Sequence, residues 1–296
     1  MSARYWKLGI LGWPLGYSLS PLMHAAALKA CGLEGEYKEY PVQPDDLWGW
    51  LEKVNDLGLS GFNVTMPYKK SVFAWVISSG GGRLGRLESI DRVIGALNTI
   101  VIEDGRPVGY NTDGEGFLRT LVEPPRALDL TDKHALLLGA GGAAQAIAVT
   151  LALKGKLGKL TIWNRHPDKA ESLAVIVKAL VQVGRSKVKA AAVPDLRSKP
   201  IELFDLIINA TPAGMKGHEE KLINTDRLKR GQIVYDLVYE PRETALAREA
   251  RIRGCDVITG DEMLAGQGAA AFELWTGVKG MLPVMRKALD EHLRAH

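Results

Sequence analysis

Cysteine is scarce in this chain of 296 residues, which contains only Cys31 and Cys255. The two lie far apart and in no Cys-x-x-Cys or Cys/His spacing, so the sequence indicates neither a disulfide framework nor a zinc site. We expect no metal, and a reducing, cytoplasmic location is the default expectation for such a chain.

Long uninterrupted apolar runs are also lacking. Glycines and a proline break the apolar stretch after Lys7 before it reaches the length of a signal-peptide core. Residues 134–153 carry no formal charge and are numerous enough to cross a membrane, but Gly139, Gly141 and Gly142 divide them. That division predicts a buried strand, a tight turn and a buried helix, and therefore no membrane span.

The charges are mixed, and no dense basic run stands out. Thirty-eight Lys and Arg face 34 Asp and Glu, a net charge of +4. This excludes the clustered basic patch of a nucleic-acid-binding surface and suits a small anionic partner. With 46% hydrophobic and 24% charged residues, the composition is that of a globular protein, and the length predicts about two domains.

Strands and helices alternate along most of the chain, which predicts an α/β fold with sheets covered by helices on both faces. In the first part we expect a helix over 21–31, a glycine-rich loop over 78–85, and strands over 5–11, 61–64, 98–102 and 106–110. From Ala135 the strands become long and apolar, as in a doubly wound Rossmann-type sheet. We expect them over 135–138, 160–163, 206–209 and 233–237.

A glycine-rich turn joins the first of these apolar strands to an alanine-rich helix. Its sequence, GAGGAA at 139–144, fits the dinucleotide fingerprint G-x-G-x-x-[G/A]. Gly139 would permit the tight turn, Gly141 would let a pyrophosphate approach the backbone, and Gly142 and Ala143 would open a helix with free N–H groups. Glycines that serve only a packed turn are the alternative, but the order of strand, turn and helix favours dinucleotide binding.

The end of the next strand indicates which dinucleotide is bound. Asn164 stands 22 residues after Gly142, near the position where a carboxylate would select NAD, and no Asp or Glu occurs there. Arg165 and Lys169 instead offer positive charge to a phosphate. The pattern favours NADP, with a solvated Arg-Lys surface as the alternative.

Polar residues also gather in segments that would otherwise be apolar. Ser18 and Ser20 precede Pro21 on a loop that enters a helix, where hydroxyls and free amides suit a carboxylate; Ser20 acting only as a helix cap is the competing interpretation. Asn63 and Thr65 alternate to one side of an extended segment and can face one cavity.

Lys69, Asn98 and Asp113 add a cation, an amide and a carboxylate to these polar groups. Taken singly, Asn98 and Asp113 are typical turn residues.

Taken together, these motifs resemble those of the shikimate dehydrogenases and the related quinate/shikimate dehydrogenases over nearly the whole chain. Nine blocks in order carry the resemblance: SLSP at 18–21 followed by His24, NVTMPYK at 63–69, IGALNT at 94–99, NTDG at 111–114, GAGGAA at 139–144, NR at 164–165, NATPAGM at 209–215, YEPRET at 239–244 and MLAGQ at 263–267.

The resemblance implies roles for individual residues. Lys69 and Asp113 would form the catalytic pair. The substrate carboxylate would be held by Ser18, Ser20 and Tyr239, and the ring hydroxyls by Thr65, Asn98, Asp113 and Gln267, with Asn63 lining the same pocket. The cofactor would contact Gly141, Gly142 and Ala143 at its pyrophosphate, Asn164 and Arg165 at its adenosine phosphate, and Thr211, Gly260 and Met263 near its nicotinamide. The fingerprint and the charge pattern described above add Gly139 and Lys169 to these cofactor residues.

The resemblance also implies an architecture and an activity. A substrate-binding catalytic domain over 1–113 and 262–296 would be interrupted by an NADP-binding Rossmann domain over 114–261, with the catalytic cleft between them. The implied reaction is the NADPH-dependent, reversible reduction of 3-dehydroshikimate to shikimate, in chorismate and aromatic amino acid biosynthesis. The expected partner is this small anionic substrate, without nucleic acid or membrane, and the expected assembly is a monomer or homodimer.

The residue types agree with this chemistry independently of the resemblance. Hydride transfer to a ketone develops an alkoxide, which must receive a proton or strong hydrogen bonds. Lys69 can supply both, and Asp113 can orient it.

Two features leave other interpretations open. His166 stands where many NADP-dependent members have Thr, and Gln145 where Arg is common, which leaves the strictness of NADP over NAD open. A quinate/shikimate dehydrogenase that uses NAD or either cofactor is the first alternative, and no residue of the sequence decides between the two substrates. A dinucleotide-binding regulatory module without catalysis is a more remote one.

Overall fold

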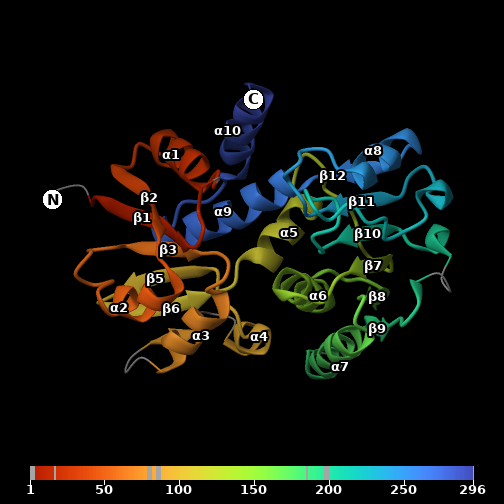
Figure 1. Cartoon of the computed structure of the whole chain (residues 1–296), viewed down its shortest axis with the longest axis horizontal. Helices are drawn as coiled ribbons and strands as arrows, with labels where there is room; N and C mark the ends of the chain where they lie inside the picture. The colour runs from red at the N-terminus through yellow and green to blue at the C-terminus, as the bar shows by residue number, and fades with distance from the viewer. Residues whose placement is uncertain are drawn as a thin grey trace. The chain divides into compact units, whose positions relative to one another are not determined.

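The computed structural model describes residues 4–16, 18–78, 82–84, 88–184, 186–196 and 200–295. The chain forms two compact units (Figure 1). Unit 1 comprises Met1–Gly116 and Leu264–His296, and unit 2 comprises Phe117–Met263. The chain leaves unit 1 within α5 (Asp113–Val122) and returns to it within α9 (Gly260–Thr276).

Unit 1 is built around a mixed sheet with the strand order β2-β1-β3-β5-β6-β4. Its strands are β1 (Trp6–Gly12), β2 (Gly35–Pro41), β3 (Gly61–Val64), β4 (Arg83–Leu84), β5 (Thr99–Glu103) and β6 (Arg106–Tyr110). Strand β1 is parallel to β2 and β3, β5 runs antiparallel to both β3 and β6, and β4 is parallel to β6. The turn of the β5-β6 hairpin contains Asp104 and Gly105, both with positive φ, as Asp-Gly turns require.

Helices cover both faces of this sheet, because its strands are apolar on both sides. On one face, Leu8 and Ile10 pack with residues of α1 (Ser20–Ala30), α9 and α10 (Leu282–Ala295). On the other, Leu11 and Phe62 pack with α2 (Leu47–Glu52) and α3 (Lys69–Ser78), seen on the opposite side from α1 in Figure 1. Helix α4 (Glu88–Ile94) and a 3₁₀ turn (Pro44–Asp46) complete the unit.

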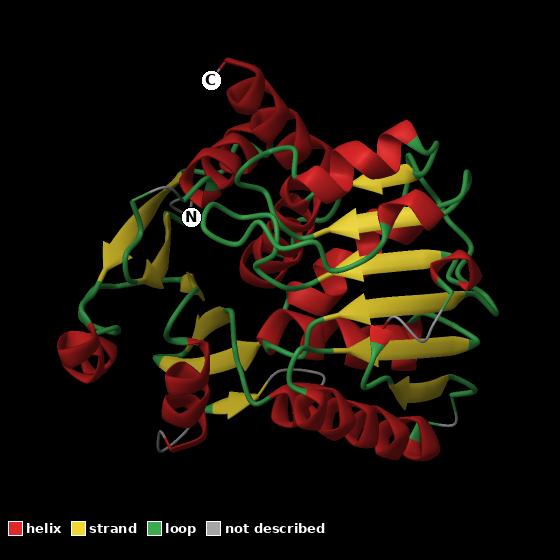
Figure 2. Cartoon of the chain, turned by 45° about the vertical axis from the view of Figure 1, so that its right-hand side comes forward, coloured by secondary structure: helices red, strands yellow, loops and turns green. Residues whose placement is uncertain are grey.

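Unit 2 contains a parallel sheet with the order β12-β11-β10-β7-β8-β9. Figure 2 shows its arrows side by side and pointing the same way. Its strands are β7 (His134–Leu138), β8 (Lys159–Trp163), β9 (Lys189–Ala192), β10 (Leu206–Asn209), β11 (Ile233–Asp236) and β12 (Asp256–Ile258). The order reverses between β7 and β10, and this switch point is where Rossmann-type sheets bind dinucleotides.

The helices of unit 2 are α6 (Gly142–Lys154), α7 (Pro167–Val183) and α8 (Ala245–Ile252), with 3₁₀ turns at Ile201–Leu203 and Thr225–Arg227. Helix α6 is buried continuously from Ala146 to Ala152. The uncharged run at 134–153 is therefore a core strand, a turn and a core helix, as predicted. Among the described residues, the structure has no helix long and apolar enough to cross a membrane.

The α/β fold class predicted from the sequence is confirmed, and so are the predicted strands and helix to within one residue at each end. No residue range was predicted for the edge strands β2, β4, β9 and β12. The expected loop at 78–85 is wrong in part, because Ser78 ends α3 and β4 pairs with β6. Residues 79–81 and 85 of that loop lie outside the described residues.

Candidate functional site

Lys69 and Asp113 form the centre of a polar site in unit 1. Lys69 is the first residue of α3, after β3, and Asp113 is the first residue of α5, after β6. Lys69 Nζ lies 2.6 Å from Asp113 Oδ2, and the Asp113 side chain is buried whereas the Lys69 side chain is 28% exposed. The first turn of a helix favours the Asp113 charge. The pair is thus a charge-assisted hydrogen bond whose cation remains accessible to a ligand.

Asn98 holds the other oxygen of Asp113. Its Nδ2 donates to Asp113 Oδ1 at 2.8 Å and to Thr112 Oγ1 at 3.0 Å, and it lies 3.4 Å from Gln267 Oε1. Its Oδ1 accepts from the Thr112 backbone N–H at 2.7 Å. One buried amide therefore brings together Asn98, Asp113 and Gln267, three residues that the sequence analysis placed at the substrate.

Asn63 and Thr65 lie at the end of β3, next to this cluster. Asn63 is buried, and its Nδ2 donates to the Asn98 carbonyl oxygen and to Thr99 Oγ1, both at 3.1 Å. Thr65 is half-buried, and its backbone N–H donates to the Leu11 carbonyl oxygen. Both residues are thus fixed by neighbouring strands of the same sheet.

The cap interpretation of Ser20 is wrong. The N-cap of α1 is Leu19 and has no side-chain cap, whereas Ser20 is the first helical residue and is 2% exposed. Ser18 Oγ instead accepts from the Ser20 backbone N–H at 3.3 Å. Ser20 therefore does not cap α1, and carboxylate binding by its buried hydroxyl stays a prediction.

In unit 2, the predicted fingerprint connects β7 to α6 at the switch point. Gly139 has φ of +116°, and a Cβ there would lie 2.8 Å from the Ala210 carbonyl oxygen, so this turn requires glycine. A Cβ on Gly141 or Gly142 would meet no atom within 4 Å. The α6 N-cap, Gly141, has no side-chain cap, so free space and helix N–H groups coincide. These features fit a pyrophosphate.

Asn164, Arg165 and Lys169 follow the end of β8, next to β7. Asn164 Oδ1 accepts from the His166 backbone N–H at 2.9 Å, which shapes the turn before α7. Arg165 and Lys169 are exposed and have no ion-pair partner among the described residues. Two unpaired cations at this strand end can receive a phosphate.

Thr211 and Tyr239 lie on two loops of unit 2. Hydrogen bonds to the buried carboxylate of Asp236 connect these loops. Thr211 Oγ1 donates to Asn209 Oδ1 at 2.7 Å, and Asn209 Nδ2 donates to Asp236 Oδ1 at 2.9 Å. Asp236 also accepts from the Val238 N–H and from Thr244 Oγ1. Burial raises the pKa of Asp236, and these donors oppose the rise. Tyr239 is 41% exposed on the second loop.

Gly260 and Met263 are placed by packing. A Cβ on Gly260 would lie 2.2 Å from the Leu237 carbonyl oxygen, so glycine is needed there for a close backbone approach. Met263 is buried in the core of unit 2. Their predicted contact with a nicotinamide stays a prediction.

The chain was compared with known proteins. Residues 10–100 match the family model "Shikimate dehydrogenase substrate binding domain", residues 123–261 match "Shikimate / quinate 5-dehydrogenase", and residues 260–289 match "Shikimate 5'-dehydrogenase C-terminal domain". The shikimate dehydrogenase (NADP(+)) of Moorella thermoacetica is 43% identical over 294 residues, covering 97% of this chain and 94% of that protein. The chain belongs to the shikimate dehydrogenase family.

Solved structures of this family have the same fold. Shikimate dehydrogenase of Thermus thermophilus, in complex with NADP(H) and shikimate, is 34% identical with a TM-score of 0.82, covering 97% of this chain and 99% of that chain. Quinate dehydrogenase of Corynebacterium glutamicum, in complex with NAD, is 30% identical with a TM-score of 0.83, covering 97% and 100%. Family membership therefore leaves both acids and both cofactors to be considered.

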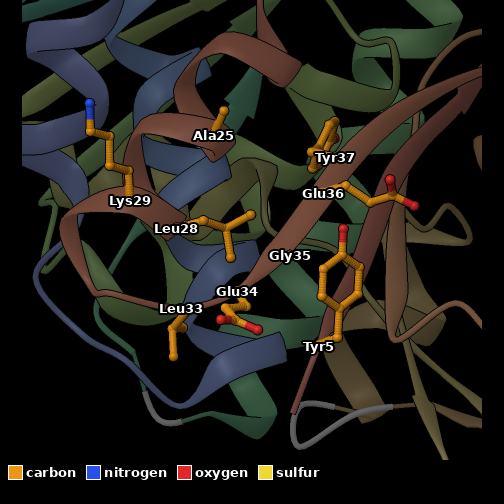
Figure 3. Close-up of a pocket in the computed structure, with 9 residues that line it drawn as sticks. All are labelled: Tyr5, Ala25, Leu28, Lys29, Leu33, Glu34, Gly35, Glu36 and Tyr37. Atoms are coloured by element: carbon orange, nitrogen blue, oxygen red, sulfur yellow. The ribbon is translucent and has the colours of Figure 1, made fainter. Parts of the chain in front are cut away.

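One pocket of unit 1 lies apart from the predicted site residues. Figure 3 shows a pocket of about 370 Å³ between the end of α1 and the start of β2, lined by Leu28, Lys29 and Glu34 among others. None of the predicted site residues lines it. Among the described residues, no group of three or more His, Cys, Asp or Glu is arranged to hold a metal ion.

Sequence reasoning missed three residues of these networks. Thr112 was quoted only as part of a motif, although it bonds Asn98 through both its backbone and its side chain. Asp236 is the last residue of the apolar strand β11. A carboxylate at the carboxyl end of a parallel strand is a known indication of a functional position, and it could have led to this residue. Tyr37, whose hydroxyl lies 2.8 Å from Asn63 Oδ1, is on the edge strand β2, which was not predicted, so no pattern pointed to it.

Proposed function

We propose that this chain is an NADP-dependent shikimate dehydrogenase that reversibly reduces 3-dehydroshikimate to shikimate, in chorismate and aromatic amino acid biosynthesis. The observation that carries the proposal is the Lys69-Asp113 pair at 2.6 Å, held by Asn98 and next to Gln267. The fingerprint at 139–144 and the cations Arg165 and Lys169 support NADP as the cofactor.

The proposed proton transfer follows from the position of Lys69. Bound NADPH would supply the hydride. As the new C–H bond forms, the electron pair of the C=O π bond moves to oxygen, and Lys69 Nζ donates a proton to that oxygen. Asp113 orients the ammonium and stabilises its charge, while the 28% exposure of Lys69 allows a new proton to arrive from water. In the oxidation direction, neutral Lys69 takes the hydroxyl proton.

The remaining predicted residues bind the ligands. In unit 1, Ser18 and Ser20 would hold the substrate carboxylate, and Thr65, Asn98 and Gln267 the ring hydroxyls, with Asn63 beside them. Tyr239 of unit 2 would add a hydroxyl to the carboxylate. Asn164 would contact the adenosine end of the cofactor, and Thr211, Gly260 and Met263 its nicotinamide end.

The test is steady-state oxidation of shikimate and of quinate, each with NADP⁺ and with NAD⁺, followed by nicotinamide absorbance. The proposal expects much the highest kcat/KM for shikimate with NADP⁺. Quinate with NAD⁺ is the second candidate, because the 30% identical relative is a quinate dehydrogenase in complex with NAD. Folded protein without turnover on any pairing would contradict both. Sedimentation would test the expected monomer or homodimer, and a cytoplasmic location stays an expectation.

A further inference from the structure

Tyr37 is a buried tyrosine beside the site for which the reaction has no assigned role. It comes from β2, at the edge of the unit 1 sheet, yet its side chain is only 8% exposed. Its hydroxyl lies 2.8 Å from Asn63 Oδ1. Burial raises the pKa of Tyr37 well above its usual value, and the nearby Ser20 side chain opposes the rise. The phenol therefore stays protonated and can donate.

The neighbours of Asn63 fix the direction of this hydrogen bond. Asn63 Nδ2 lies 3.1 Å from the Asn98 carbonyl oxygen, which can only accept, so the NH₂ group must face that side. Its second proton is directed to Thr99 Oγ1. Asn63 Oδ1 then faces Tyr37, and the Tyr37 hydroxyl must be the donor.

This arrangement limits what Asn63 can offer to a ligand. Both amide protons are used, and one of the two lone pairs on Oδ1 is taken by Tyr37. One lone pair is left. Asn63 can therefore accept a hydrogen bond from a ligand hydroxyl but has no proton to give to a ligand carbonyl or carboxylate.

The His24 ring stacks on the Tyr37 ring. The two rings are stacked with centroids 4.3 Å apart and planes 5° from parallel, and Phe272 and Trp275 lie against the other sides of His24. His24 is fully buried, and neither ring nitrogen has a hydrogen-bond partner among the described residues. Its contribution is thus a flat neutral surface that restricts Tyr37.

We propose that Tyr37, supported by His24, is a positioning residue that holds Asn63 as an acceptor for one ring hydroxyl of the substrate. The inference rests on the proposed function, because it needs a polyhydroxylated ring acid in this pocket. The arrangement would also contribute to specificity. A ligand with a hydroxyl facing Asn63 Oδ1 would bind better than a ligand with only an acceptor there, because two acceptors cannot form a hydrogen bond with each other.

The test is Tyr37→Phe, which keeps the stacked ring and removes the hydroxyl that donates to Asn63. We expect KM and the calorimetric Kd for shikimate to rise about 2- to 10-fold, the effect of one lost neutral hydrogen bond. We expect kcat to stay within about twofold, and KM for NADP⁺ to be unchanged. Tyr40→Phe is the matched control: Tyr40 is on the same strand, its ring packs on Trp50, and its hydroxyl has no partner among the described residues.

A double-mutant cycle with Asn63→Ala separates positioning from direct contact. If Tyr37 acts through Asn63, adding Tyr37→Phe to Asn63→Ala changes Kd by less than about twofold. Additive losses would overturn the proposal, because Tyr37 would then act on substrate binding by a route other than Asn63. An unchanged KM and Kd in Tyr37→Phe, with active wild-type enzyme, would overturn it as well.

Failure of the proposed function gives a different result. Wild-type protein that neither binds nor turns over shikimate would remove the function, and with it the role of Tyr37. A lower melting temperature in Tyr37→Phe with unchanged Kd would assign Tyr37 to folding only, and so overturn the positioning role.

Discussion

Gly116 of α5 packs directly on the backbone of Gln267 in α9, so closely that a Cβ on Gly116 would lie 2.2 Å from the Gln267 nitrogen. Asp113 begins the first of these helices, and Gln267 lies near Asn98, which also holds Asp113. The absence of one methyl group therefore sets the distance between two helices that carry site residues.

Substitution of this glycine tests that relationship. Gly116→Ala must separate the two helices, so we expect a loss of about 1–3 kcal/mol in the free energy of unfolding and a lower kcat/KM. Gly49→Ala, in α2, is the matched control: a Cβ there meets nothing within 4 Å, and we expect a gain of about 0.5–1 kcal/mol. Thermal and urea unfolding would measure both, and equal shifts would contradict the close-packing explanation.

Removal of the Lys69 ammonium tests the proton transfer. We expect Lys69→Ala to lower kcat by about 10²- to 10⁴-fold, because the ammonium that would protonate the developing alkoxide is lost, while substrate binding changes little. Lys70→Ala, one residue further along α3 and exposed, should retain wild-type kinetics. Near-normal turnover in Lys69→Ala would remove Lys69 from its role.

Arg165 should decide the preference for the cofactor phosphate. A charge-assisted hydrogen bond is worth about 1.5–3 kcal/mol, so Arg165→Ala is expected to raise KM for NADP⁺ by about 10- to 100-fold. The same variant assayed with NAD⁺ is the internal control, because that cofactor lacks the phosphate. An equal loss with both cofactors would indicate that Arg165 supports the fold of the β8-α7 turn instead.

Burial of His24 makes the free energy of unfolding depend on pH. Burial lowers the pKa of His24 to about 3, whereas the unfolded chain has a value near 6.5. Between these values the unfolded chain binds the additional proton. Stability is therefore complete above about pH 6.5 and falls as the pH decreases, by at most about 1.4 kcal/mol per pH unit.

Urea unfolding at pH 7, 6 and 5 checks this dependence. His24→Phe keeps an aromatic ring against Tyr37 and cannot titrate, so we expect its stability to fall less steeply than that of the wild type. His218→Phe, at an exposed position, should retain the wild-type slope. Identical slopes in all three proteins would show that another group causes the acid sensitivity.

The strands of both sheets could be predicted where apolar runs are continuous and bounded by turn residues. Strands β7, β8, β10 and β11 are buried on both faces, and their predicted ranges agree with the structure to within one residue. Strand β2 was missed because it lies at a sheet edge and carries Glu36, Lys38 and Glu39. Strand β9 was missed because three of its four residues are alanine, which favours strands weakly.

The site could be predicted only in part, because its contacts are distant in sequence. Lys69 and Asp113 are 44 residues apart, and no local periodicity brings them together; the family resemblance did. Ser20 was open to a local explanation, which the structure removed. The hydrogen bond between Tyr37 and Asn63 depends on which strands are neighbours in the sheet, and the sequence does not determine that order.

Because unit 1 is formed by two separate segments of the chain, the two units are expected to fold in a fixed order. Unit 2 is one continuous segment, whereas the core of unit 1 places Leu8 and Met23 against Phe272 and Met285, from opposite ends of the chain. During synthesis, the C-terminal residues that complete this core are made after unit 2, so we expect the apolar side chains of the N-terminal strands to stay uncovered while unit 2 folds. We therefore expect pulsed hydrogen exchange during refolding to show protection of the β7 and β10 amides before those of β1. The C-terminal helices would then complete the core of unit 1 last.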